Sequence, residues 1–110
     1  MATSDDSSGA TFDEYNPQYQ LHEEWNKIFL QSNENWAGEV LKARGHIFLN
    51  EVFDQIGFPR TKAGQVQGWW LEAGNHNEVD FDISPFTADN GKVRYHLSFN
   101  IDGDILGRLP

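Results

Sequence analysis

Apolar side chains recur at helical spacing over the first half of the chain. One stripe, which follows Pro17, consists of Leu21, Trp25, Ile28 and Phe29, and a second consists of Trp36, Val40, Ala43, Ile47, Leu49, Phe53 and Ile56. The first stripe predicts a helix from Pro17, and the second predicts a long helix over residues 34–56 with Gly45 inside it. Gly57 and Pro59 end the second helix, because glycine accepts a left-handed conformation and proline prevents the helix from resuming.

In the second half, apolar residues alternate with polar ones, as in half-buried strands. This pattern predicts strands at residues 65–71, 79–83 and 93–101, and a hairpin turn at Asp102 and Gly103 that leads into a short last strand at 104–109. The side of the sheet that faces the core is predicted to hold Val79, Phe81, Ile83, Val93, Tyr95, Leu97, Phe99 and Ile101. The predicted fold class is α+β: two N-terminal helices packed on one face of a small antiparallel sheet, a meander of about four strands.

Composition divides the chain into a tail and one domain. Residues 1–16 are rich in serine and acidic side chains and offer little apolar area, so we expect an acidic mobile tail, followed by a single α+β domain over residues 17–110. The net charge of -9 makes direct binding to nucleic acid unfavourable. No apolar run reaches the roughly 18 residues of a membrane span, so we expect no membrane contact for this chain.

Nothing in the residue pattern points to catalysis. The chain has no cysteine, and its four histidines lack the spacing of metal ligands. Nucleophile elbows and phosphate-binding glycine patterns are absent as well. We therefore expect no enzyme, no catalytic residue, no metal and no cofactor; a small enzyme without a recognisable motif is the least favoured hypothesis.

Two sets of residues are candidates for a binding surface. Neighbouring side chains on a strand point to opposite faces, so one of Trp69 and Trp70 is predicted to join the core while the other is exposed or covered by a loop. An exposed tryptophan is a frequent interface anchor. The predicted protein-binding residues are Phe58, Pro59, Arg60, Trp69 and Trp70, and the alternative is an acidic face formed by Glu78, Asp80 and Asp82. Charge pairing with Arg94 and His96 on the neighbouring strand is the simpler explanation of those three acids.

Three segments resemble the C-terminal domain of a family of uncharacterised bacteriophage proteins. They are LKARGHIFLNEVFDQIGFPRTKAGQVQGWW at 41–70, VDFDI at 79–83 and LSFNIDGDI at 97–105. The resemblance implies a phage origin and carries no catalytic residue over to this chain. It marks residues 58–64 as a distinctive segment, either a rigid joint between helix and sheet or a binding loop. Gly64 and Gly68 are predicted to permit close approach of another part of the chain.

These observations lead to a hypothesis of function. We expect a non-enzymatic bacteriophage accessory or virion-associated protein that acts through contact with another protein, from the phage or from the host. It would be found in the host cytoplasm or on the virion. The alternative is an acidic phage inhibitor of a host defence or nucleic-acid-handling protein, in which carboxylates imitate phosphates.

Overall fold

The computed structural model describes residues 9–73 and 78–108 and confirms the α+β class. Its helices are α1 (Glu23–Arg44) and α2 (Leu49–Ile56). Its strands are β1 (Gly9–Phe12), β2 (His46–Phe48), β3 (Gly68–Trp70), β4 (Ser84–Thr87) and β5 (Val93–Ser98). Single 3-10 turns occur at Ala63–Gln65, Leu71–Ala73 and Leu106–Arg108.

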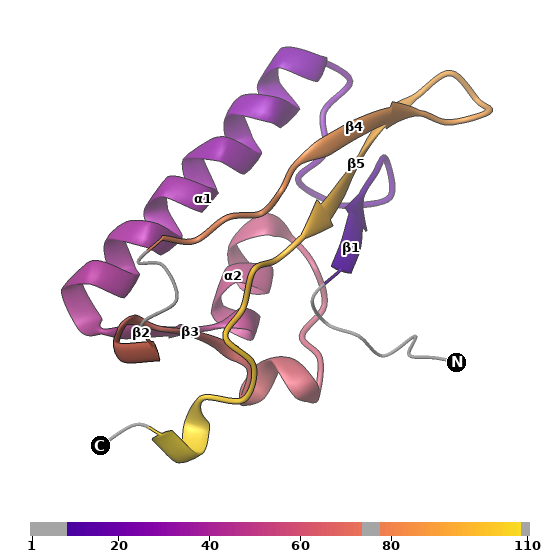
Figure 1. Cartoon of the computed structure of the whole chain (residues 1–110). Coiled ribbons are helices and arrows are strands. Elements are labelled where there is room, and N and C mark those ends of the chain that lie inside the picture. The colour runs from indigo at the N-terminus through magenta and orange to yellow at the C-terminus, as the bar shows by residue number, and fades with distance from the viewer. Residues whose placement is uncertain (1–8, 74–77, 109–110) are drawn as a thin grey trace.

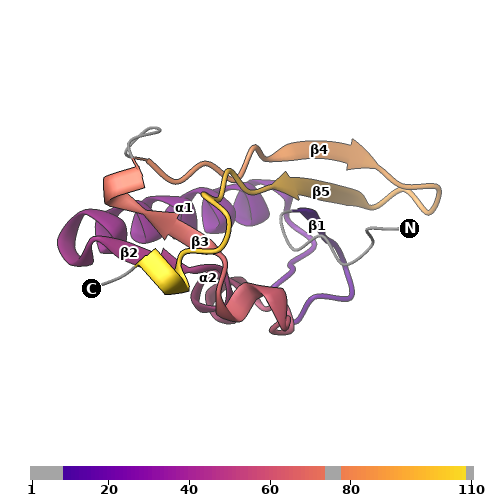
Figure 2. The ribbon, with the colours of Figure 1, turned by 60° about the horizontal axis from the view of Figure 1, so that its bottom comes forward.

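The strands form two separate antiparallel sheets. β5 lies between β1 and β4 in one sheet, and β2 pairs with β3 in the other. α1 runs roughly along the direction of β4 and β5 (Figure 1). In the view of Figure 2, α2 lies below β4 and β5. The prediction of two N-terminal helices packed on one face of a single meander is therefore wrong. β1 precedes the helices, and β3 pairs with a strand that lies between them.

The N-terminal segment supplies an edge strand, so the predicted end of the tail at residue 16 is wrong. β1 pairs with β5 and sets Phe12 opposite Tyr95. The Phe12 side chain is completely buried, and its ring centroid lies 5.7 to 6.4 Å from those of Tyr19, Phe29, Phe58 and Tyr95. The apolar area that the Phe12 ring buries thus stabilises this segment against the fold, although the residues around it are mostly polar. Residues 1–8 of the predicted tail lie outside the described residues.

The helix boundaries also differ from the prediction. α1 continues through residue 34 and ends at Arg44, because Gly45 adopts a left-handed conformation with φ 90° and donates its N–H to Leu41 O. Gly45 therefore stops a helix instead of lying inside one. Pro17 lies in a turn before α1. The predicted end of the second helix is confirmed, since Gly57 follows Ile56 with φ 82°.

The alternating residues of the second half face the core as predicted. Val79, Phe81, Tyr95, Leu97 and Phe99 are buried, and Ile83, Val93 and Ile101 pack against the same core. Residues 79–83 run beside the end of β5 and the residues that follow it. Ser98 N–H, for example, donates a hydrogen bond to Phe81 O at 2.8 Å. Regular pairing starts only at Ser84, so the predicted strand at 79–83 is wrong in its bounds. Pro85 is accepted in β4 because β4 is an edge strand, where a missing N–H is tolerated.

The predicted last hairpin does not form. Gly103 accepts a hydrogen bond from Gly68 N–H at 3.0 Å, and Asp102 N–H donates to Gly68 O at 2.7 Å. The segment therefore packs along β3. Ile105 is buried beyond it, and a 3-10 turn stands in place of the last strand.

An ion pair joins the N-terminal segment to β5. The Arg94 guanidinium donates to both carboxylate oxygens of Glu14, at 3.0 and 2.8 Å, and Asn90 donates to the same carboxylate at 2.8 Å. Hydrogen bonds from Arg94 and Asn90 lower the pKa of Glu14 to about 2. The predicted pairing of Arg94 with the acids of residues 78–82 is thus wrong, because Glu14 occupies its donors.

We expect Glu14→Gln to remove a pH-dependent part of the stability. The pKa of Glu14 falls from 4.5 to about 2 on folding. Its ionised form therefore stabilises the fold above about pH 4.5, and this contribution is lost as the pH falls toward 2. Urea unfolding of the wild type and the variant between pH 7 and pH 3 should show a difference in stability that shrinks on acidification. A difference that does not change with pH would contradict this assignment.

Candidate protein-contact surface

Helix α1 carries large apolar side chains on two faces. One face is buried and includes Leu30, Ala37 and Leu41. The other, which we call the aromatic face, consists of Trp25, Ile28 and Trp36, whose exposed fractions are 39%, 58% and 37%. At 3.6 residues per turn these three residues fall within a sector of about 80°, well away from the buried face. The aromatic face is thus turned away from the core.

Trp25 is held in a defined orientation by a neighbouring ring. Its ring stacks on Phe29 with a centroid separation of 4.9 Å and an interplanar angle of 9°. Phe29 packs against the core and stacks on Phe12 at 5.8 Å. Because this stacking already restricts the indole, a partner that covers Trp25 loses less conformational entropy on binding. Trp25 and Ile28 also border a pocket of about 600 Å³, together with Gln20, His22 and Glu24.

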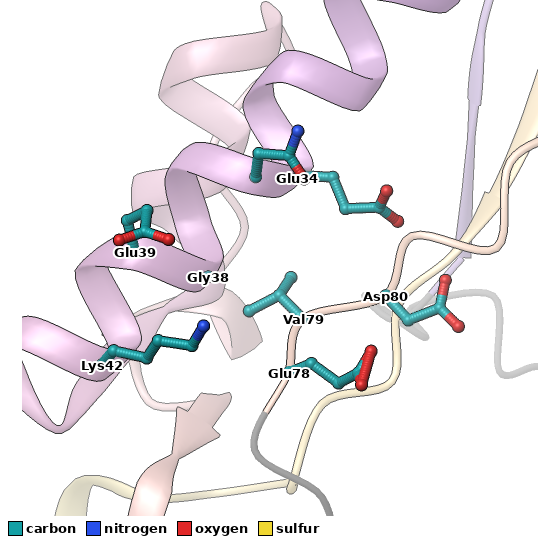
Figure 3. A pocket seen from close by; sticks show the side chains of 8 residues that line it. Glu34, Gly38, Glu39, Lys42, Glu78, Val79 and Asp80 are labelled. Atoms are coloured by element: carbon teal, nitrogen blue, oxygen red, sulfur yellow. The ribbon is translucent and has the colours of Figure 1, made fainter.

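A second feature, which we call the acidic cleft, lies between α1 and residues 78–80 (Figure 3). It has a volume of about 370 Å³ and is lined by Glu34, Asn35, Gly38, Glu39, Lys42, Glu78, Val79 and Asp80. Its lining therefore includes four acidic residues and one lysine. Glu39 follows Trp36 by three residues and is its neighbour on the helix surface, so the acidic cleft adjoins the aromatic face.

Glu34 fixes the geometry of the cleft by joining its two walls. Its Oε2 accepts the Phe81 N–H at 2.7 Å, and the side chain extends from α1 toward Asp80 (Figure 3). Burial raises the pKa of Glu34 above its usual value, and the nearby carboxylates of Asp80 and Glu78 raise it further, against the opposite effect of the Phe81 hydrogen bond. The carboxylate of Glu34 thus holds a backbone segment in place.

The three acids proposed as one face are separated by the structure. Glu78 and Asp80 line the acidic cleft, whereas Asp82 is not part of its lining. Asp82 has φ 47° and donates its N–H to Asp80 Oδ1 at 2.8 Å. Residues 78–83 do not form the regular strand that would set all three side chains on one side. His96, the second predicted cationic partner, lies in the central strand opposite Thr11 and Ser84.

The two adjacent tryptophans differ in burial, in agreement with the predicted opposite orientation. Trp69 is 1% exposed and donates its indole N–H to Asn100 Oδ1 at 2.8 Å, whereas Trp70 is half-buried and pairs in register with His46. Trp69 is therefore a core residue. The sequence pattern assigned the tryptophans with larger exposed surface, Trp25 and Trp36, to two different helices. Their common face becomes visible only when residues 23–44 are treated as one helix.

Residues 58–64 have the structure of a joint. The half-buried Phe58 ring packs edge-on against Phe53 at 5.7 Å. Arg60 pairs with Asp54 of α2 at 2.6 Å, and the Asn50 side chain exchanges two 2.9 Å hydrogen bonds with the Thr61 backbone. These contacts tie the segment to α2 and favour the rigid-joint interpretation. Of the residues proposed for binding in this segment, only Pro59 and Arg60 are exposed.

The fold and this surface define a small α+β domain with an exposed aromatic helix face beside an acidic cleft. The chain belongs to a family of unknown function, DUF6353, whose model matches residues 1–108. No curated protein and no solved structure matches it.

Within residues 9–73 and 78–108, no helix has the length and apolar character needed to cross a bilayer. The same residues contain no group of three or more His, Asp or Glu side chains placed to hold a metal ion.

Proposed function

We propose that this protein is a non-enzymatic bacteriophage accessory or virion-associated protein that acts by binding another protein. The observation that carries the proposal is the aromatic face, where Trp25, Ile28 and Trp36 are exposed on one side of α1. Tryptophan is among the residues that contribute most to binding at protein interfaces. The resemblance of residues 41–70, 79–83 and 97–105 to bacteriophage proteins supports the phage origin. From that origin we infer a location in the host cytoplasm or on the virion.

The exposed part of the aromatic face lies outside the core. The opposite side of α1 supplies the core with Leu30, Ala37 and Leu41. An isolated exposed apolar residue is ordinary, but large apolar side chains gathered on one surface mark interaction sites. Ile28 is 58% exposed, and a partner that covers it together with Trp25 and Trp36 explains why apolar surface gathers there.

A second candidate function is the acidic inhibitor of a host defence or nucleic-acid-handling protein. The acidic cleft favours it, because Glu34, Glu39, Glu78 and Asp80 gather there with Lys42 as the one basic residue of the lining. Carboxylates so placed would imitate the phosphates of a nucleic acid. Binding of this kind weakens with added salt and with charge reversal, and it does not depend on the tryptophans.

The proposed function is tested by affinity capture of the tagged full chain from infected cells, followed by mass spectrometry. We expect a partner that the wild type captures and that both a Trp25→Ala/Trp36→Ala variant and an Ile28→Glu variant lose at least tenfold. Phe86→Ser is the matched control, because Phe86 is 44% exposed and belongs to β4, not to the aromatic face of α1. Circular dichroism confirms that each variant is folded. Equal capture by the aromatic-face variants and the wild type would contradict the proposal.

A further inference from the structure

We infer that the partner covering the aromatic face is a cationic amphipathic helix of another protein. Its apolar side would cover Trp25, Ile28 and Trp36, and its lysine or arginine side chains would reach the acidic cleft. This inference rests on the proposed function and names the chemistry of the partner. It follows from the shape of the exposed stripe and from the charges at its border.

The shape of the stripe fits a helix. Trp25 and Trp36 are 11 residues apart on α1, which corresponds to about 16 Å along the helix axis. Three turns of a partner helix have the same length and present apolar residues at matching intervals along one side. Recognition of an amphipathic helix through anchors spaced in this way is a recurrent mode of peptide binding.

The charge beside the stripe decides the sign of the partner. Glu39 lies next to Trp36 on the helix surface and is also part of the acidic cleft, whose lining adds Glu34, Glu78 and Asp80 against one basic residue, Lys42. Arg44, the last residue of α1, does not offset them, because it is paired with Glu51 at 2.6 Å. A partner seated on Trp36 therefore places its flanking side chains beside a group of carboxylates, which favours lysine and arginine.

The same charges argue against a second copy of this chain. Two copies joined through their aromatic faces would bring two acidic clefts together, and each chain has a net charge of -9. Like charges held at close range oppose association. The surface therefore fits a partner with the opposite charge better than it fits itself.

The test titrates the full chain with three synthetic 18-residue peptides by calorimetry. The first is a lysine and leucine peptide with helical amphipathic order, the second has the same composition in scrambled order, and the third carries glutamate in place of lysine. We expect the first peptide to bind at least tenfold more tightly than the second, and the third not to bind. Equal binding of the first two would show only general attraction to an acidic protein and would overturn the inference.

Charge variants localise the binding. Glu39→Lys/Glu78→Lys alters the acidic cleft, and Asp89→Lys/Glu72→Lys makes the same change in net charge at exposed positions outside its lining. We expect the first pair to weaken binding of the amphipathic peptide at least tenfold and the second pair to weaken it less than threefold. An equal effect of the two pairs would overturn the inference, as would a dimer of the wild type in sedimentation that Trp25→Ala/Trp36→Ala dissociates.

Failure of the inference is distinguishable from failure of the proposed function. If the Glu39→Lys/Glu78→Lys variant captures the cellular partner as well as the wild type does, while Trp25→Ala/Trp36→Ala loses it, the contact function stands and the cationic partner is wrong. If neither variant loses the partner, the proposed function itself fails.

Discussion

Replacing Trp69 by alanine is expected to lower the free energy of unfolding by about 3 to 5 kcal/mol, the usual cost of removing a large aromatic side chain from a core. Trp69 is 1% exposed, and its ring packs edge-on against Phe99 at 6.4 Å. The substitution leaves a cavity in the core that the two sheets share, and it removes the indole hydrogen bond to Asn100. Trp69 belongs to β3, and its contacts Phe99 and Asn100 directly follow β5. Because these contacts connect the two sheets, their loss should destabilise the whole domain.

Trp70→Ala is the matched control for this prediction. Trp70 is the next residue of the same strand and is half-buried, so its loss should cost clearly less than the loss of Trp69. Urea unfolding of the two variants and the wild type, followed by circular dichroism, measures both costs. Equal or reversed costs would mean that the two faces of β3 have been assigned the wrong way round.

Local signals in the sequence predicted the parts of the fold that depend on neighbouring residues. Phe81, Leu97 and Phe99 face the core because alternation along an extended chain requires it, whatever the pairing of strands. Gly57 ends α2 because a left-handed residue is needed directly after the last turn. The pairing of β2 with β3 joins residues 20 to 24 positions apart and leaves no such local signal.

Helix α1 shows why hydrophobic spacing alone misplaced the aromatic face. The spacing of Trp25, Ile28 and Trp36 is helical, but spacing does not reveal whether a face is covered by the rest of the protein. The polar residues at 32–35, around the predicted start of the second helix at residue 34, lie inside one helix, where the Asn33 side chain donates to Phe29 O at 2.9 Å. Trp25 and Ile28 of the first predicted stripe and Trp36 of the second therefore share one exposed face of a continuous helix.

The candidate site was predictable only in part. The sequence singled out Glu78 and Asp80, but not Glu34 and Glu39, which complete the acidic cleft from the other wall. Glu34 meets the Phe81 backbone across 47 residues of sequence, so only the folded arrangement brings them together. The resemblance to phage proteins rests on residues 41–70, 79–83 and 97–105, and it assigned no role to Trp25, Ile28 or Trp36.

Gly68→Ala is expected to destabilise the domain by about 3 kcal/mol or more, because it forces overpacking against backbone that cannot rotate away. The sequence predicted that another part of the chain approaches Gly68 closely, and the structure confirms it. An added Cβ would overlap the Ile47 carbonyl oxygen and lie 2.8 Å from Phe48 Cα, both in β2. The other side of Gly68 is occupied by backbone hydrogen bonds with Asp102 and Gly103, so β3 cannot move aside without breaking them.

Gly38→Ala is the same chemical change, but here we expect the free energy of unfolding to increase. An added Cβ at Gly38 meets no atom within 4 Å, and the residue lies inside α1, where alanine is favoured over glycine by about 1 kcal/mol. Thermal and urea unfolding should therefore show a stabilised Gly38→Ala variant and a strongly destabilised Gly68→Ala variant. A Gly68→Ala variant within about 0.5 kcal/mol of the wild type, the range of ordinary surface substitutions, would contradict the close approach of β2 and β3. Such a result would also remove the reason why glycine stands at the start of the strand that carries Trp69.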